Sequence, residues 1–169
     1  MTTTSRLKSW IPNDSVLVVA RWSDVAAADP DLAAHVRRCF AVRKHATLAT
    51  LRRDGSPRIS GTEVSFDDDG NVYLGMMEGS RKALDLRRDP RLALHCPTED
   101  APEGDPSAWL GDAKIAGVGV EITPPPGSED GSHRFSVDVT EVVVTTVAGD
   151  LLVIRSWHPD RGVEIRERH

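Results

Sequence analysis

From residue 46 onward, apolar side chains recur at every second position, the spacing that places one face of a β-strand against a core. This alternation predicts strands over residues 46–51, 57–66, 71–77, 91–95, 113–122, 135–147 and 151–157. Tight turns are expected at residues 53–56 and 67–70, so the first three strands form an antiparallel meander. Gly117 and Gly119, inside the fifth strand, indicate a bulge or a close approach by another backbone. Six to seven short strands at regular spacing predict a mainly β protein, a closed antiparallel barrel rather than a sandwich.

Two to three short helices are expected beside the strands. Asp29 is an N-cap before Pro30 at the first helical position, and apolar residues then recur at helical spacing to about residue 42. Ser80 is a good N-cap for a second short helix, which ends before Pro90.

The chain is expected to form one domain, residues 23–169, preceded by an N-terminal arm, residues 1–22. Residues 15–19, SVLVV, are either a short strand or an extended arm lying on this domain or on a second subunit. Residues 158–169 are expected to be a polar tail.

Charge and hydropathy limit the partners. The chain has 26 acidic and 21 basic residues, a net charge of −5, whereas nucleic-acid binding needs a basic face. No apolar run reaches the roughly 18 residues that suggest a membrane span. We therefore expect a cytoplasmic protein with no nucleic-acid or membrane partner. Cys39 and Cys96 lie in no metal-ligand spacing, so we expect reduced thiols and no metal site, although the sequence alone leaves a disulfide open.

The sequence Ser80-Arg81-Lys82 places two cations in the first turn of the second helix. The exposed N–H groups and the helix dipole make that end positive, so each cation costs roughly 0.3–1 kcal/mol unless an anion offsets it. A phosphate would reverse this cost, because backbone donors, the serine hydroxyl and both cations would converge on it, and Gly79 lets the chain approach closely. The alternative is that both side chains simply extend into solvent.

Three segments resemble the pyridoxamine 5′-phosphate oxidase-like family of FMN-binding split barrels. They read ATLATLRRDGSPRISGTEV, VYLGMMEGSRKALDLRRDPRLALH and SWHPDRGV, in the family's order over roughly residues 40–160. The resemblance implies a split barrel that forms a homodimer, with FMN between the subunits. It implies a phosphate site made by Arg58, Ser80, Arg81 and Lys82. It also implies a surface along the flavin ring, made by Ile59, Ser60, Gly61, Thr62, Gly75, Met76 and Trp157.

Two departures from the family pattern argue against pyridoxamine-phosphate oxidase activity. Glu63 stands where the family enzyme has a lysine that assists the cofactor, and Arg161-Gly162-Val163 replaces its R-x-H substrate grip. We therefore expect an FMN-dependent oxidoreductase with an unidentified substrate and no assigned catalytic residue, since His45, His95 and His158 are equally eligible as acid or base.

Other readings stay open within this fold. The deazaflavin F420 would use additional cations such as Lys44, Arg52 and Arg53, and haem would use His95 or His158 as a ligand. The protein could also carry or sense a flavin or tetrapyrrole without catalysis, or have a site that has decayed. Trp157 is as easily a core residue as a cofactor wall.

Overall fold

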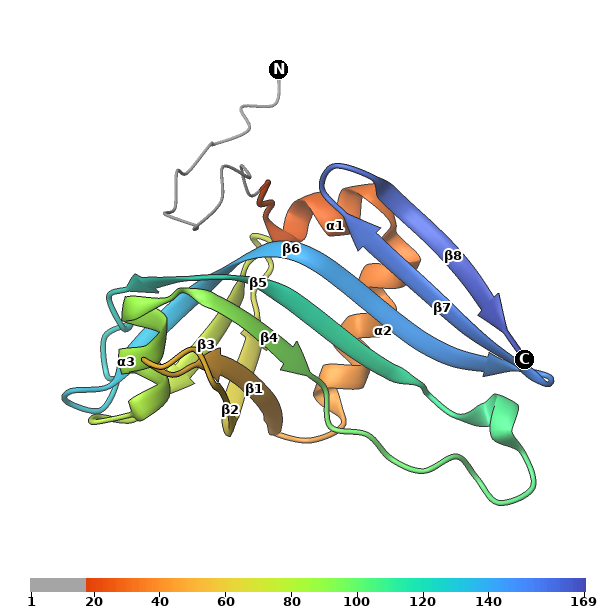
Figure 1. Ribbon diagram of the computed structural model, residues 1–169, viewed down its shortest axis with the longest axis horizontal. Helices are drawn as coiled ribbons and strands as arrows, with labels where there is room; N and C mark the ends of the chain where they lie inside the picture. The colour runs from red at the N-terminus through yellow and green to blue at the C-terminus, as the bar shows by residue number, and fades with distance from the viewer. Residues whose placement is uncertain (1–17) are drawn as a thin grey trace.

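The computed structural model describes residues 18–169 as eight strands, three α-helices and one short 3₁₀-helix (Figure 1). The strands are β1 (His45–Leu51), β2 (Pro57–Phe66), β3 (Val72–Met76), β4 (Arg91–His95), β5 (Asp112–Ile122), β6 (His133–Ala148), β7 (Leu151–His158) and β8 (Gly162–Arg168). The helices are α1 (Trp22–Ala28), α2 (Pro30–Ala41), α3 (Arg81–Arg88) and η1 (Pro106–Ala108).

Six of the strands close into an antiparallel barrel. They follow the order β3-β2-β1-β4-β5-β6, and β3 also pairs with β6. The alternating apolar residues point inward, and Leu48, Leu74, Ile115 and Phe135 are at most 1% exposed. The prediction of a mainly β, antiparallel split barrel with two to three short helices is therefore confirmed.

Strands β7 and β8 continue the sheet from β6, outside the barrel (Figure 1). The assignment of residues 158–169 to a polar tail was wrong, because β8 pairs with β7 along its length, with Val163 opposite Trp157. Val163 and Ile165 remain 38% and 60% exposed. Only Val163 and Ile165 alternate as apolar residues in this strand, which is too short a pattern to predict it, and its partner strand supplies its backbone hydrogen bonds.

Helix α2 packs against β5 and β6. The expected cap at Asp29 is confirmed, because its Oδ1 accepts a hydrogen bond of 3.0 Å from the backbone N–H of Leu32. Helix α1 was not predicted, yet its Trp22 and Val25 are 1% and 0% exposed and join the core. Within residues 18–169, every helix is too short or too polar to cross a lipid bilayer.

The predicted N-terminal arm lies mostly outside the described residues, which begin at residue 18. At its end, Ala20 and Val139 of β6 exchange two backbone hydrogen bonds, of 2.9 and 2.7 Å. This last part of the arm therefore packs on its own barrel.

The irregularity expected at Gly117 is confirmed. The register of β5 against β6 shifts between Ala116 and Gly117. A β-carbon at position 117 would overlap the carbonyl oxygen of Asp138. The glycine is therefore required by a close approach of the β6 backbone.

Candidate cofactor-binding site

Helix α3 begins at a tight turn and is held on the barrel by its apolar side. Gly79 has a φ of 70°, and Ser80 is extended before the helix starts at Arg81. Ala83 and Leu86 are 0% and 2% exposed. Apolar packing thus anchors this side of α3 on the barrel.

Two polar contacts join α3 to β2. The Lys82 ammonium donates to the backbone carbonyl of Gly61, and the Asp85 carboxylate accepts a hydrogen bond from Arg58. The contact residues are three apart on the helix and three apart on the strand. Residues 82–85 of α3 therefore lie along residues 58–61 of β2, with Lys82 beside Gly61 and Arg58 beside Asp85.

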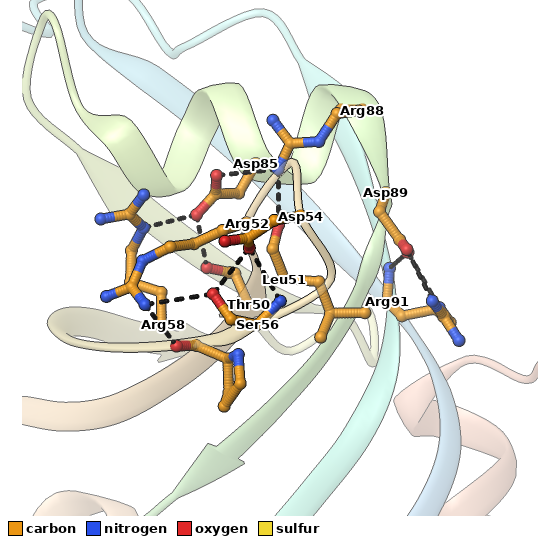
Figure 2. A network of polar contacts seen from close by, with 11 residues as sticks. Thr50, Leu51, Arg52, Asp54, Ser56, Arg58, Asp85, Arg88, Asp89 and Arg91 are labelled. Atoms are coloured by element: carbon orange, nitrogen blue, oxygen red, sulfur yellow. Dashed lines mark hydrogen bonds and ion pairs between the residues drawn. The ribbon is translucent and has the colours of Figure 1, made fainter.

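Asp85 is the centre of a buried polar network (Figure 2). Its side chain accepts from Arg58 Nε at 2.5 Å, Thr50 Oγ1 at 3.0 Å and an Arg88 terminal nitrogen at 3.0 Å. Burial alone would raise the pKa of the Asp85 carboxyl, but the hydrogen bonds from Arg58, Arg88 and Thr50 outweigh it and hold that pKa below its usual range. The carboxylate is therefore charged at neutral pH, although the residue is only 3% exposed.

The N-terminus of α3 has no internal anion. Ser80 occupies the N-cap position as expected, but its side chain makes no capping hydrogen bond, and the first turn contains no acidic residue. Arg81 is exposed, and burial lowers the pKa of the Lys82 ammonium. Among residues 18–169, neither cation has a carboxylate within salt-bridge distance, so this end of the helix is positively charged.

The residues expected along a flavin ring divide between the two faces of β2 and β3. Ile59 is 74% exposed on the outer face, and a β-carbon added at Gly61 or Gly75 would meet no atom within 4 Å. Thr62 and Met76 point inward and are 2% and 5% exposed. On the inner side, Ser60 Oγ is buried with no hydrogen-bond partner in the part of the chain that the structure describes. The outer face thus offers side-chain contacts and open space, whereas the inward residues offer only their backbone.

Trp157 lies apart from the other predicted site residues. It is on β7, opposite Val142 of β6, and is 4% exposed within the apolar core. Of the two roles that the sequence left open, this burial favours the core role. Contact of Trp157 with a cofactor stays a prediction.

The three candidate histidines all face carboxylates. His45 Nε2 lies 3.7 Å from Glu63, and His158 Nε2 lies 3.4 Å from Glu141. His95 Nδ1 hydrogen-bonds the backbone carbonyl of Cys96 at 2.7 Å. Its Nε2 lies 3.5 Å from a carboxylate oxygen of Asp112. None is distinguished as an acid or base.

Sequence reasoning missed Asp85, Thr50 and Arg88. The partners of Asp85 at Thr50 and Arg58 are 35 and 27 residues away. The one local signal is the spacing of Asp85 and Arg88, three residues apart on a helix, which permits an ion pair.

No family model and no curated protein sequence matches the chain. Solved structures do match it. A pyridoxamine 5′-phosphate oxidase-related, FMN-binding protein from Nostoc punctiforme has a TM-score of 0.59 and 12% identity, covering 83% of this chain and 96% of that one. The chain has the split-barrel fold of the pyridoxamine 5′-phosphate oxidase-related proteins. A second split barrel, PhzG from Burkholderia lata in complex with tetrahydrophenazine-1-carboxylic acid, has a TM-score of 0.57 and 14% identity, covering 87% and 89% of the two chains.

The split-barrel fold does not fix the ligand. A heme-binding protein from Mycobacterium smegmatis also matches, with a TM-score of 0.50 and 14% identity over 82% of this chain and 88% of that one. At such identities the likeness establishes the fold alone. The choice of cofactor must be argued from the side chains of this chain.

Proposed function

We propose that this protein binds FMN at the junction of α3 and β2 and acts as a homodimeric oxidoreductase on a small molecule that is not identified. The observation that carries the proposal is that Lys82 and Arg58 both lie between α3 and β2, bonded to Gly61 and Asp85, while the first turn of α3 holds no acidic residue. Backbone N–H groups at a helix start, an unused hydroxyl at Ser80 and nearby cations together form a site for a phosphate dianion.

The space beside this junction suits the rest of FMN. Gly61 and Gly75 are open to a flat ring, because no atom lies within 4 Å of where their side chains would start. Bound FMN would supply hydride-transfer chemistry, and the protein would bind and orient it.

The dimer is part of the proposal because large apolar side chains near the site are exposed within residues 18–169. Ile59, Met77 and Leu84 are 74%, 75% and 54% exposed, and they flank Gly61 and the start of α3. A second subunit placed here would bury these side chains and enclose the flavin between the two chains.

F420 is the alternative cofactor, and the contacts of this chain favour it less. Of the cations suggested for its longer anionic tail, Lys44 is paired with Glu63 at 2.9 Å. Arg52 donates to the Pro57 carbonyl at 3.0 Å. Only Arg53 remains exposed with no such contact among residues 18–169.

The other alternative is a carrier or sensor that binds a flavin, haem or another tetrapyrrole without catalysis. At His95 both ring nitrogens already have polar neighbours, the Cys96 carbonyl at Nδ1 and the Asp112 carboxylate at Nε2, which disfavours this histidine as a haem ligand. Reduction of the bound flavin by NADH or NADPH distinguishes an enzyme from a carrier, because flavin bound to a carrier would not be reduced.

The test is a set of titrations of the apoprotein with FMN, F420 and haem, followed by fluorescence or by the Soret band, with light scattering for subunit number. We expect FMN binding at micromolar concentration or below, no F420 or haem binding, and a dimer. Failure of FMN to bind would overturn the proposal, and tight F420 binding alone would make the protein a deazaflavin reductase.

A further inference from the structure

We infer that Asp85 is a positioning residue that orients Arg58 toward a bound phosphate. The inference rests on the proposed function, because it concerns the same phosphate site. It is drawn from the network of Figure 2, in which one buried carboxylate binds two guanidinium groups and one hydroxyl.

The carboxylate is not needed to attach α3 to the barrel. Ala83 and Leu86 already bury the apolar side of the helix, and an apolar residue at position 85 could have done the same. A buried charge is costly unless it is paired and hydrogen-bonded. The presence of a charged Asp85 at this buried position therefore indicates a role that an apolar side chain cannot fill. We assign it the role of holding a guanidinium in a fixed direction.

The contact that Asp85 makes with Arg58 uses Nε alone. The two terminal nitrogens of Arg58 point away from Asp85 in Figure 2, and they make no hydrogen bond to any of residues 18–169. An arginine anchored through Nε still offers its terminal N–H groups to an anion, with less freedom to lose on binding. The side chain of Arg58 is 21% exposed, so part of it reaches the surface.

The orientation of Arg58 and the net charge of the network predict opposite effects on phosphate binding when Asp85 is replaced. Asp85 carries one negative charge and its partners Arg58 and Arg88 carry two positive charges, so the network as a whole is singly positive. Replacing Asp85 by asparagine would raise the positive charge that a phosphate meets. If attraction alone governed binding, that variant would bind phosphate more tightly, whereas positioning predicts weaker binding.

The experiment compares Asp85→Asn with the control Asp89→Asn, in which the same charge is lost from a carboxylate that pairs with Arg91 at the other end of α3. Dissociation constants are measured for FMN, for riboflavin, which lacks the phosphate, and for inorganic phosphate through the thermal shift it causes. We expect Asp85→Asn to weaken FMN binding by roughly 10-fold or more, the order of one charge-assisted hydrogen bond. Riboflavin binding should be unchanged, and Asp89→Asn should bind FMN like the wild type.

Equal or tighter FMN and phosphate binding by Asp85→Asn would overturn the inference. A loss of riboflavin binding in parallel with FMN would also overturn it, because it would indicate a purely structural role. If Asp85→Asn does not fold, Thr50→Val removes a neutral donor to the same carboxylate, and the Arg58 Nε–H resonance reports whether the guanidinium is still held. If the wild type binds inorganic phosphate but not FMN, the flavin proposal fails, and the phosphate measurements still test the role of Asp85. If the wild type binds none of the three probes, both the flavin proposal and the role of Asp85 are overturned.

Discussion

Replacing Arg81 and Lys82 together by alanine should weaken FMN binding far more than it alters the stability of the apoprotein. Both cations lie in the first turn of α3, where each costs roughly 0.3–1 kcal/mol without an anion. Lys82 regains roughly 0.5–1.5 kcal/mol through its hydrogen bond to the Gly61 carbonyl. These contributions oppose one another, so the free energy of unfolding should stay within about 1.5 kcal/mol of the wild type.

The same substitutions remove two cations from a bound phosphate. A hydrogen bond to a charged group contributes roughly 1.5–3 kcal/mol, so losing two should cost about 3–6 kcal/mol. At about 1.4 kcal/mol for each tenfold change, the dissociation constant for FMN should rise roughly 10²- to 10⁴-fold.

Fluorescence titration with FMN and urea denaturation of the apoprotein measure the two quantities. The matched control is Arg166→Ala with Arg168→Ala, which removes the same charge from exposed positions of β8. The control should bind FMN like the wild type at moderate salt. Unchanged FMN affinity in the Arg81 and Lys82 variant, or the same loss in the control, would refute the assignment of the phosphate site.

Four further predictions concern single positions. Because the pKa of Asp85 is depressed in the folded state, its stabilisation is present above about pH 4 and is lost as the pH falls through the lower folded value. Urea titrations at several pH values should therefore show a smaller acid loss for Asp85→Asn than for the wild type, and equal pH slopes would contradict this. The neighbouring Cys39 thiol is the largest cause that lowers the pKa of Cys96, so Cys39→Ala should raise the midpoint of the Cys96 thiolate absorbance, and an unchanged midpoint would contradict this interaction. Gly61→Val should fold normally but block FMN, because no atom lies within 4 Å of the new β-carbon. Gly117→Ala should instead destabilise the protein by more than roughly 2 kcal/mol by overlap with the β6 backbone, as thermal unfolding would measure.

The barrel could be predicted from the sequence because its strands alternate strongly between buried and exposed positions. In β6, residues Phe135, Val137 and Val139 point inward and are at most 3% exposed, and this regularity is visible without a structure. Strand β8 has no such face, since Val163 and Ile165 are largely exposed. Its existence depends on pairing with β7, which a single-sequence pattern does not report.

The candidate site was predictable to the extent that it depends on local chemistry. Cations directly after a helix cap are unfavourable, and the sequence Ser80-Arg81-Lys82 alone shows this arrangement. The burial of Trp157 was not predictable, because the same side chain suits a core or a ligand surface and the sequence does not say which residues surround it.

Counting basic residues overstates the charge available to a ligand, because the partner of each cation is often distant in the sequence. Arg58 meets Asp85 from 27 residues away, and Arg87 binds Glu121 from 34 residues away. Lys44 is paired with Glu63 in the same way. Within residues 18–169, Arg81 and Lys82 have no carboxylate partner at the start of α3, and Arg58 is paired with a carboxylate that fixes its direction. A phosphate at this junction would therefore meet two cations that attract it and one that is oriented to bind it, which is why charge and geometry can be separated by substitution at Asp85.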